Sequence, residues 1–160
     1  MSVISLDELK KQYEEFKLKY ELPSFEELNH DFEIEGLQEK ETDMLSKEIR
    51  RCLADRNASY LRFIDTFQNP TSAPMFFFTL IKNINEYEKK ILNEMYLELG
   101  KFEFKSITLD NEYDEQKDAE FIKEFYGFWQ ELKKKFKKIM IGFEESWERK
   151  VEKKDKGYLG

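Results

Sequence analysis

Four of the five arginines of this chain lie within thirteen residues, at Arg50, Arg51, Arg56 and Arg62. Most other positive charges are lysines. A planar guanidinium donates two parallel hydrogen bonds to a carboxylate or a phosphate, and it tolerates burial better than an ammonium group. The cluster therefore indicates either internal ion pairs or a site that binds phosphate or nucleic acid.

Arg56 is the arginine whose position is most informative. It follows Ile49 by seven residues and precedes Phe63 by seven, so the sequence predicts it on the apolar face of a helix. A charge on that face needs a carboxylate partner or a ligand. We expect pairing with Asp55, Asp65 or an acid of the N-terminal segment. The alternative is that Arg56 serves a binding site.

A second basic segment lies near the C-terminus, where five lysines fall between Lys133 and Lys138. Such a patch suits phosphate or an acidic partner, and Lys133, Lys134 and Lys137 are its candidate binding residues. Glutamates flank the run, and no aromatic side chain shares its face. The favoured interpretation is therefore the solvated side of an amphipathic helix.

Glu27 and His30 form a Glu-x-x-His motif, the spacing that places two metal ligands on one face of a helix. The chain has a single histidine, so it cannot supply a second pair of this kind. We expect His30 to be a surface or capping residue, which leaves Glu27 and His30 as an outside candidate for a metal site. No cofactor is predicted.

The sequence gives little support for a catalytic nucleophile. Cys52, the only cysteine, lies on an apolar helix face with no histidine nearby, which favours a buried, unreactive thiol. There is no glycine-rich phosphate loop. The chain has so many carboxylates that the sequence does not identify one pair as a catalytic acid and base. We therefore expect that the protein is not an enzyme.

Helices must position these residues, and the clearest helix lies between Phe121 and Trp147. Its apolar residues are Phe125, Trp129, Leu132, Phe136, Ile139 and Phe143. They stand alternately four and three positions apart, which keeps them on one face. A helix with one apolar face is stable when that face packs against another apolar surface and is removed from water, so this pattern predicts long helices packed against one another.

The same spacing predicts further helices earlier in the chain. They cover Leu6–Tyr20, a short segment around Phe25–Phe32, Glu39–Gln68, and a segment that begins near Pro74 and ends at Leu99. Ser24 with Glu27 matches a capping box, and Gly100 suits the position that follows a helix. The short connection at 69–72 predicts that the helices it joins are antiparallel.

Two short segments, 31–35 and 101–109, alternate apolar and charged residues. Alternation with β-branched residues predicts strands. Two such strands would pair as a small ribbon on the helices, although a ribbon alone is marginal. A continued helix over 101–109 is the alternative that the sequence leaves open.

The composition limits the class of protein. The 160 residues suit a single domain over 1–160, with 152–160 expected as a loose tail. No apolar run approaches the ~20 residues that a membrane span needs. No signal peptide is recognisable, and a lone cysteine favours a reducing, cytoplasmic compartment. Enrichment in lysine and glutamate is typical of heat-adapted proteins, although an AT-rich genome gives a similar bias.

The net charge of −7 is distributed unevenly along the chain. Residues 1–45 carry a net charge of −8, and residues 132–160 carry +5. An acidic first segment and a basic last helix are suited to steering a partner or a second copy of the chain. The overall acidity argues against a general nucleic-acid binder.

The sequence thus predicts a mainly α, single-domain bundle of four to five helices, with long antiparallel helices and at most a minor two-stranded β element. The function we expect is a non-enzymatic protein–protein interaction module or a subunit of a larger assembly, with another protein or a second copy as partner and no membrane. The alternative is a nucleic-acid or phosphate-binding protein that uses the arginine cluster.

Overall fold

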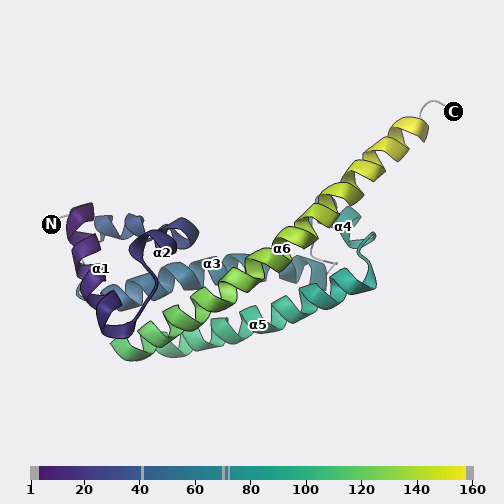
Figure 1. Ribbon diagram of the computed structural model, residues 1–160. Coiled ribbons are helices and arrows are strands. Elements are labelled where there is room, and N and C mark those ends of the chain that lie inside the picture. Colours follow the sequence, from purple (N-terminus) through teal and green to yellow (C-terminus); the bar gives the residue numbers. More distant parts are fainter. Residues whose placement is uncertain (1–3, 41, 70, 72, 158–160) are drawn as a thin grey trace.

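A computed structural model describes residues 4–40, 42–69, 71 and 73–157, with side chains as far as Arg149. The described residues form helices and short connections, without a strand (Figure 1). The helices in chain order are α1 (Leu6–Tyr20), α2 (Phe25–Phe32), the 3₁₀ helix η1 (Ile34–Glu39), α3 (Leu45–Gln68), α4 (Met75–Ile81), α5 (Glu86–Asp110) and α6 (Glu115–Gly157). The mainly α class is therefore confirmed.

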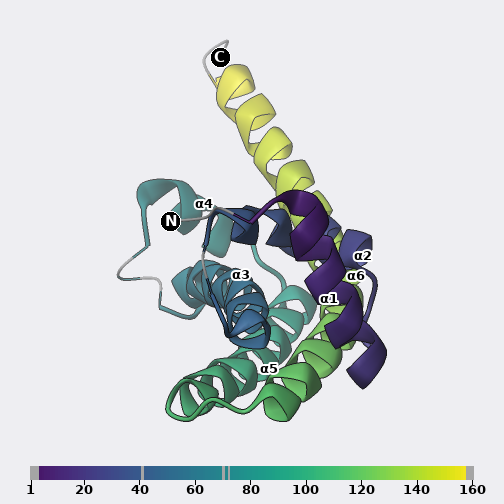
Figure 2. The same cartoon turned by 90° about the vertical axis from the view of Figure 1, so that its left-hand side faces the viewer.

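Three long helices, α3, α5 and α6, form the centre of the molecule and pack against one another. Helix α5 runs antiparallel to both α3 and α6 (Figure 1). The end-on view shows α1 and α2 against one side of this group (Figure 2). Helix α4 packs on α3 and α6 at the opposite end, and the last turns of α6 extend beyond the bundle (Figure 1).

Aromatic rings fill the core between the three long helices. The ring of Phe102 on α5 lies 5.1 Å from that of Phe125 on α6. The ring of Tyr60 on α3 lies 4.8 Å from that of Trp129 on α6. The face of α6 predicted from its spacing is therefore the face that packs. Each buried ring removes a large apolar area from water, which stabilises the bundle.

The helix count is higher than predicted, because two predicted helices are divided differently. The segment expected to run from Pro74 to Leu99 is two helices, with the second capped by Asn85, whose Oδ1 accepts a hydrogen bond from the Glu88 amide at 2.8 Å. The helix expected from Glu39 begins at Leu45 and is preceded by η1. Gly100 does not end a helix, since α5 continues to Asp110.

Neither alternating segment is a strand, and for 101–109 the alternative of a continued helix is confirmed. Residues 101–109 belong to α5, and residues 31–35 belong to the end of α2 and the start of η1. In a helix, Phe102 and Phe104 point to different sides. Phe102 is buried against α6 and Phe104 faces water, so the alternation reflects two apolar faces on one helix.

Helix α6 is continuous across Gly127 and Gly142 and is helical as far as Gly157. Residues 158–160, the end of the predicted loose tail, lie outside the described residues. None of the described helices combines the length and the apolar character that crossing a bilayer requires.

Candidate interaction surface

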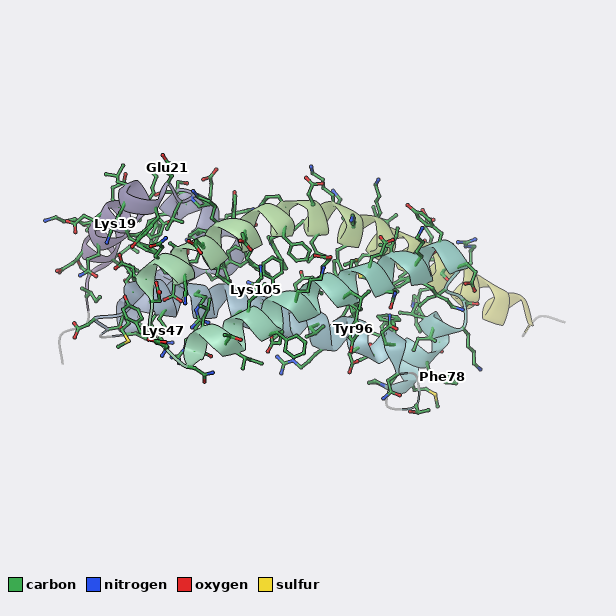
Figure 3. All side chains as sticks on the ribbon, turned by 90° about the horizontal axis from the view of Figure 1, so that it is seen from below. Lys19, Glu21, Lys47, Phe78, Tyr96 and Lys105 are labelled. Atoms are coloured by element: carbon green, nitrogen blue, oxygen red, sulfur yellow. The ribbon has the colours of Figure 1, made fainter. Side chains whose placement is uncertain are left out.

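The outer face of α5 carries large apolar side chains that the protein's own fold does not cover. Leu97, Phe104 and Ile107 are 56%, 75% and 55% exposed. Their spacing of seven and three places them on one side of the helix. Figure 3 shows the molecule from below and labels Tyr96 and Lys105, which lie along α5. We call Leu97, Gly100, Phe104 and Ile107 the α5 stripe.

A groove of about 850 Å³ adjoins the stripe where α3, α5 and α6 meet. Its apolar lining comes from all three helices and includes Leu61, Leu97, Phe104, Phe128 and Leu132. Its charged lining consists of Glu94, Glu98, Glu103, Glu131, Lys101 and Lys135. An apolar floor with a charged rim is the arrangement that binds an amphipathic helix.

The two faces of α5 explain why this surface exists. Its inner face buries Leu92, Met95, Leu99, Phe102 and Ser106 between α3 and α6. The stripe lies on the opposite side, so no rotation of α5 could bury both sets at once. A helix that is apolar on both sides is stable when a second layer covers it.

The charges beside the stripe are paired within the chain. Nζ of Lys101 lies 2.9 Å from Oε1 of Glu98 on the same helix. Nζ of Lys105 lies 2.7 Å from Oε2 of Glu124 on α6. These side chains are about half exposed or more, so the pairs contribute little to stability and can exchange for pairs with a partner.

Arg50, the first arginine of the cluster, is completely buried between α3, α5 and α6. Its Nε donates to Oδ1 of Asp118 at 2.7 Å, and its Nη2 donates to Oδ1 of Asp110 at 2.5 Å. Its Nη1 donates to the carbonyl and hydroxyl oxygens of Ser106 at 3.1 and 2.8 Å. Oγ of Ser46 completes the network by donating to Oδ2 of Asp118 at 2.9 Å. Arg50 is therefore a structural residue.

Arg56 pairs with an acid of the N-terminal segment, as expected, but its predicted burial is wrong. Its Nη2 lies 3.3 Å from Oε2 of Glu33, and its side chain is 35% exposed. The buried residues of α3 are Ser46, Ile49, Arg50, Leu53, Asn57 and Ile64. Seven residues advance a helix by about 20° less than two full turns, so each step from Ile49 moves away from the centre of this face, and Arg56 lies at its edge.

The four arginines of the cluster do not form one site, although Arg51 shares the Asp110 carboxylate with Arg50. Arg51 lies on the surface, 3.4 Å from Oε1 of Glu48 and 3.7 Å from Oδ1 of Asp110. Arg62 is exposed and makes no ion pair with the described part of the chain. Arg50 is inside the core, whereas Arg51 and Arg56 form ion pairs outside it. The cluster therefore presents no shared cavity for a phosphate.

The lysines between Lys133 and Lys138 have different surroundings: one forms an ion pair with another helix, and others face solvent. Nζ of Lys133 lies 2.9 Å from Oδ1 of Asp31, which is almost fully buried, and so joins α6 to α2. Lys134 pairs with Glu131 one turn earlier, at 3.2 Å. Lys137 is exposed and lines a smaller cavity of about 290 Å³ beside Tyr60. The interpretation as the outer side of an amphipathic helix is consistent with these positions.

Glu27 and His30 lie on α2, where the carboxylate of Glu27 accepts a hydrogen bond from the amide of Ser24 at 2.8 Å and completes the predicted capping box. His30 is exposed in the last turn of that helix. Within residues 4–149, apart from 41, 70 and 72, no three side chains of the metal-binding types converge. Burial raises the pKa of the Cys52 thiol to about 11, so the thiol is protonated at neutral pH.

The α5 stripe was not predicted from the sequence, although a signal was present. Phe102 and Phe104 alternate with Lys and Glu, so the sequence left 101–109 open between a strand and a continued helix. Read at helical spacing, Leu97, Phe104 and Ile107 form a second apolar row on the same helix. A helix with two such rows indicates one face for the core and one for a partner.

Comparisons with known proteins were negative: no family model, curated protein or solved structure matches this chain.

Proposed function

We propose that this protein is a non-enzymatic helical interaction module, a subunit or scaffold of a larger assembly, that binds its partner through the α5 stripe and the adjoining groove. The observation that carries the proposal is the exposure of Leu97, Phe104 and Ile107, each more than half exposed on one helix face. Covering apolar surface is favourable by about 25 cal/mol per Å². Contiguous exposed apolar patches commonly mark binding sites.

The shape of the groove supports a helical partner. Leu61 and Leu132 contribute apolar surface from α3 and α6, while Glu94 and Lys135 contribute charge. An amphipathic helix that lies along α5 would insert apolar side chains at spacings of three, four and seven. Its polar side would remain in water.

The chemistry of the remaining residues supports a role without catalysis. The thiol of Cys52 is held in its protonated form by burial. The carboxylate of Glu27 is occupied by a helix cap. The lone His30 is on the surface of α2.

A matched pair of variants tests the proposal. Phe104→Glu places a charge on the stripe, whereas Tyr87→Glu changes an aromatic side chain that is 70% exposed on the same helix but outside the stripe. Each variant and the parent are used to capture partners from an extract of the source cells. We expect Phe104→Glu to lose partners that the parent and Tyr87→Glu retain. Identical sets of partners for all three proteins would contradict the proposal.

The alternative function, binding of nucleic acid or phosphate through the arginine cluster and Lys133–Lys138, has weaker support. Arg50 is buried in an internal network, and Arg56 and Lys133 are paired with Glu33 and Asp31. Binding through the remaining exposed cations would depend strongly on salt. A gel-shift series tests this alternative, which is excluded if no complex forms at low salt.

A further inference from the structure

We propose that α1, α2 and η1 form a lid that opens as one unit while α3, α5 and α6 stay folded. We call residues 4–40 the cap, and α3, α5 and α6 the core helices. The cap lies on one side of the core helices (Figure 2). The cap and the α5 stripe share no residue, so this device adds to the proposed function and does not depend on it.

The aromatic rings of α1 and the start of α2 form a cluster inside the cap. The ring of Tyr13 lies 6.3 Å from that of Phe16 and 5.8 Å from that of Phe25. Leu9 and Leu28 are also buried on these two helices. Helix α1 packs on both α2 and η1. The cap therefore has an apolar centre of its own, which can stay packed when the cap moves away.

Phe32 at the end of α2 is the aromatic connection between the cap and the core helices. Its ring lies 5.8 Å from that of Phe125 and 5.6 Å from that of Trp129, both on α6. Among the ring pairs of the described residues, these two cross from the cap to the core helices. Next to Phe32, η1 packs on α3 and buries Ile34 and Leu37. Apolar packing across the boundary is therefore concentrated at the end of α2 and in η1.

A cavity of about 400 Å³ lies between α1 and the core helices. It is lined from α1 by Gln12, Glu15 and Lys19, and from the other side by Ser46, Tyr113 and Glu115. These side chains are polar or charged, so apolar packing does not close this part of the boundary. Regions held by few buried apolar contacts open at a lower free energy than the rest of a fold.

Two ion pairs run from carboxylates of the cap to cations of the core helices. Nζ of Lys133 on α6 lies 2.9 Å from Oδ1 of Asp31, and Nε2 of Gln130 donates to the other oxygen of Asp31 at 2.9 Å. Nη2 of Arg56 on α3 lies 3.3 Å from Oε2 of Glu33. The cap has eleven acids and five lysines. This acidic unit therefore covers and neutralises two cations of the core helices.

Two further ion pairs across the boundary have the opposite polarity. Nζ of Lys19 lies 2.8 Å from Oε1 of Glu115, at the start of α6. Nζ of Lys40 lies 3.4 Å from Oε2 of Glu48 on α3. The two lysines are 64% and 62% exposed. Salt weakens exposed pairs, because the Debye length falls from about 10 Å at 0.1 M to about 3 Å at 1 M. The closed position of the cap therefore depends on ionic strength.

Opening of the cap changes the surface that α3 and α6 present. Withdrawal of Phe32 uncovers the rings of Phe125 and Trp129, and it leaves Arg56 and Lys133 without their carboxylates. The closed cap thus masks a surface that is both aromatic and cationic. This contact is autoinhibitory, since other molecules reach that surface only after the cap has opened.

Hydrogen exchange of the full chain, followed by mass spectrometry, tests the opening. The best-protected amides of α1, α2 and η1 should share one protection factor, at least about ten-fold below that of the middle of α3 and α6. Raising NaCl from about 0.1 to about 1 M should lower this factor several-fold. Equal protection of the cap and the core helices, or α1 and α2 that exchange independently, would overturn the proposal. A cap that does not respond to salt would overturn its control by ion pairs.

A variant of a core helix distinguishes opening of the cap from unfolding of the whole chain. Ile64 is fully buried near the end of α3 that packs on α4. Ile64→Val should lower the protection of the core helices about five-fold. It should leave the protection of the cap as in the parent. If the cap exchanges only when the whole chain unfolds, both parts lose protection by the same factor, and the proposal fails.

Asp31→Asn and Glu14→Gln are matched variants that test the link between Asp31 and Lys133. Asp31→Asn removes a carboxylate that crosses the boundary, and it should lower the protection of the cap about ten-fold. Glu14→Gln removes a carboxylate that pairs with Lys17 on the same helix, and it should leave the opening unchanged. Equal effects of the two substitutions on the cap would show that Asp31 does not hold it closed.

Discussion

Nε of Arg50 donates a hydrogen bond to Oδ1 of Asp118 at 2.7 Å, and both side chains are buried where α3, α5 and α6 meet. Helix α3 is thereby joined to the start of α6, while the same guanidinium also bonds to Ser106 and Asp110 near the end of α5. The three central helices share one buried cation. Their relative position, and with it the orientation of the α5 stripe, depends on this network.

Replacing Arg50 should therefore destabilise the fold far more than replacing Arg56. Arg50→Ala leaves Asp118 buried without its counter-charge, which should lower the free energy of unfolding by about 3–5 kcal/mol. Arg56→Ala removes a surface pair with Glu33 and should cost less than about 1 kcal/mol. Urea unfolding of the two variants beside the parent measures both values. Equal losses would contradict the assignment of Arg50 as the structural arginine.

Stability should fall in acid partly because of Asp110. Burial alone would raise the pKa of this carboxyl group, but the hydrogen bond from Arg50 and its charge, with Arg51, hold the pKa below its ordinary value. A carboxyl group with a lowered pKa in the folded state stabilises the fold above its unfolded pKa of about 4, and the contribution is lost as pH falls below that value. Asp110→Asn should be less stable than the parent at pH 7, with a smaller further loss in acid. Unfolding curves from neutral pH down to about pH 2 measure this difference, and parallel curves would contradict it.

The sequence was sufficient to predict α1, α2 and most of α3 and α6, because each has a single apolar face. It was insufficient for the centre of the buried face of α3. Ile49 is buried there, but the seven-residue steps from Ile49 to Arg56 and Phe63 drift towards the edge of that face. Arg50 and Asn57 lie nearer its centre, and an apolar pattern does not reveal them because they are polar. Only the acids at 110 and 118, distant in sequence, reveal why Arg50 can be buried.

The candidate surface was missed for a related reason. Phe104 and Ile107 belong to the outer row of α5, and nothing in the local sequence distinguishes a row that faces the core from one that faces a partner. The break between α4 and α5 was also missed. Asn85 and Glu88 cap the second helix, but the apolar spacing from Leu80 to Ile91 continues across the gap.

Gly100→Ala separates the stability of one chain from its association. The substitution should stabilise the monomer by about 0.5–1 kcal/mol, since alanine favours the helix and its Cβ has space. The same methyl group lies on the α5 stripe and should weaken the binding of a partner there. Thermal unfolding and capture of partners from an extract of the source cells measure the two effects.

Gly127→Ala on α6 is the matched control for this prediction. A Cβ at Gly127 also has no neighbour within 4 Å, and the residue lies outside the stripe. It should stabilise the helix to a similar degree and leave association unchanged. Equal effects of the two substitutions on association would show that Gly100 has no special role at the contact.

The most direct test of the interaction surface is photo-crosslinking from the α5 stripe. A benzophenone amino acid is placed at position 104 in one protein and at position 87 in another, and each is irradiated in an extract of the source cells. We predict strong adducts with a partner protein from position 104 and none from position 87. Absence of adducts from position 104, or the same adducts from both positions, would contradict the account.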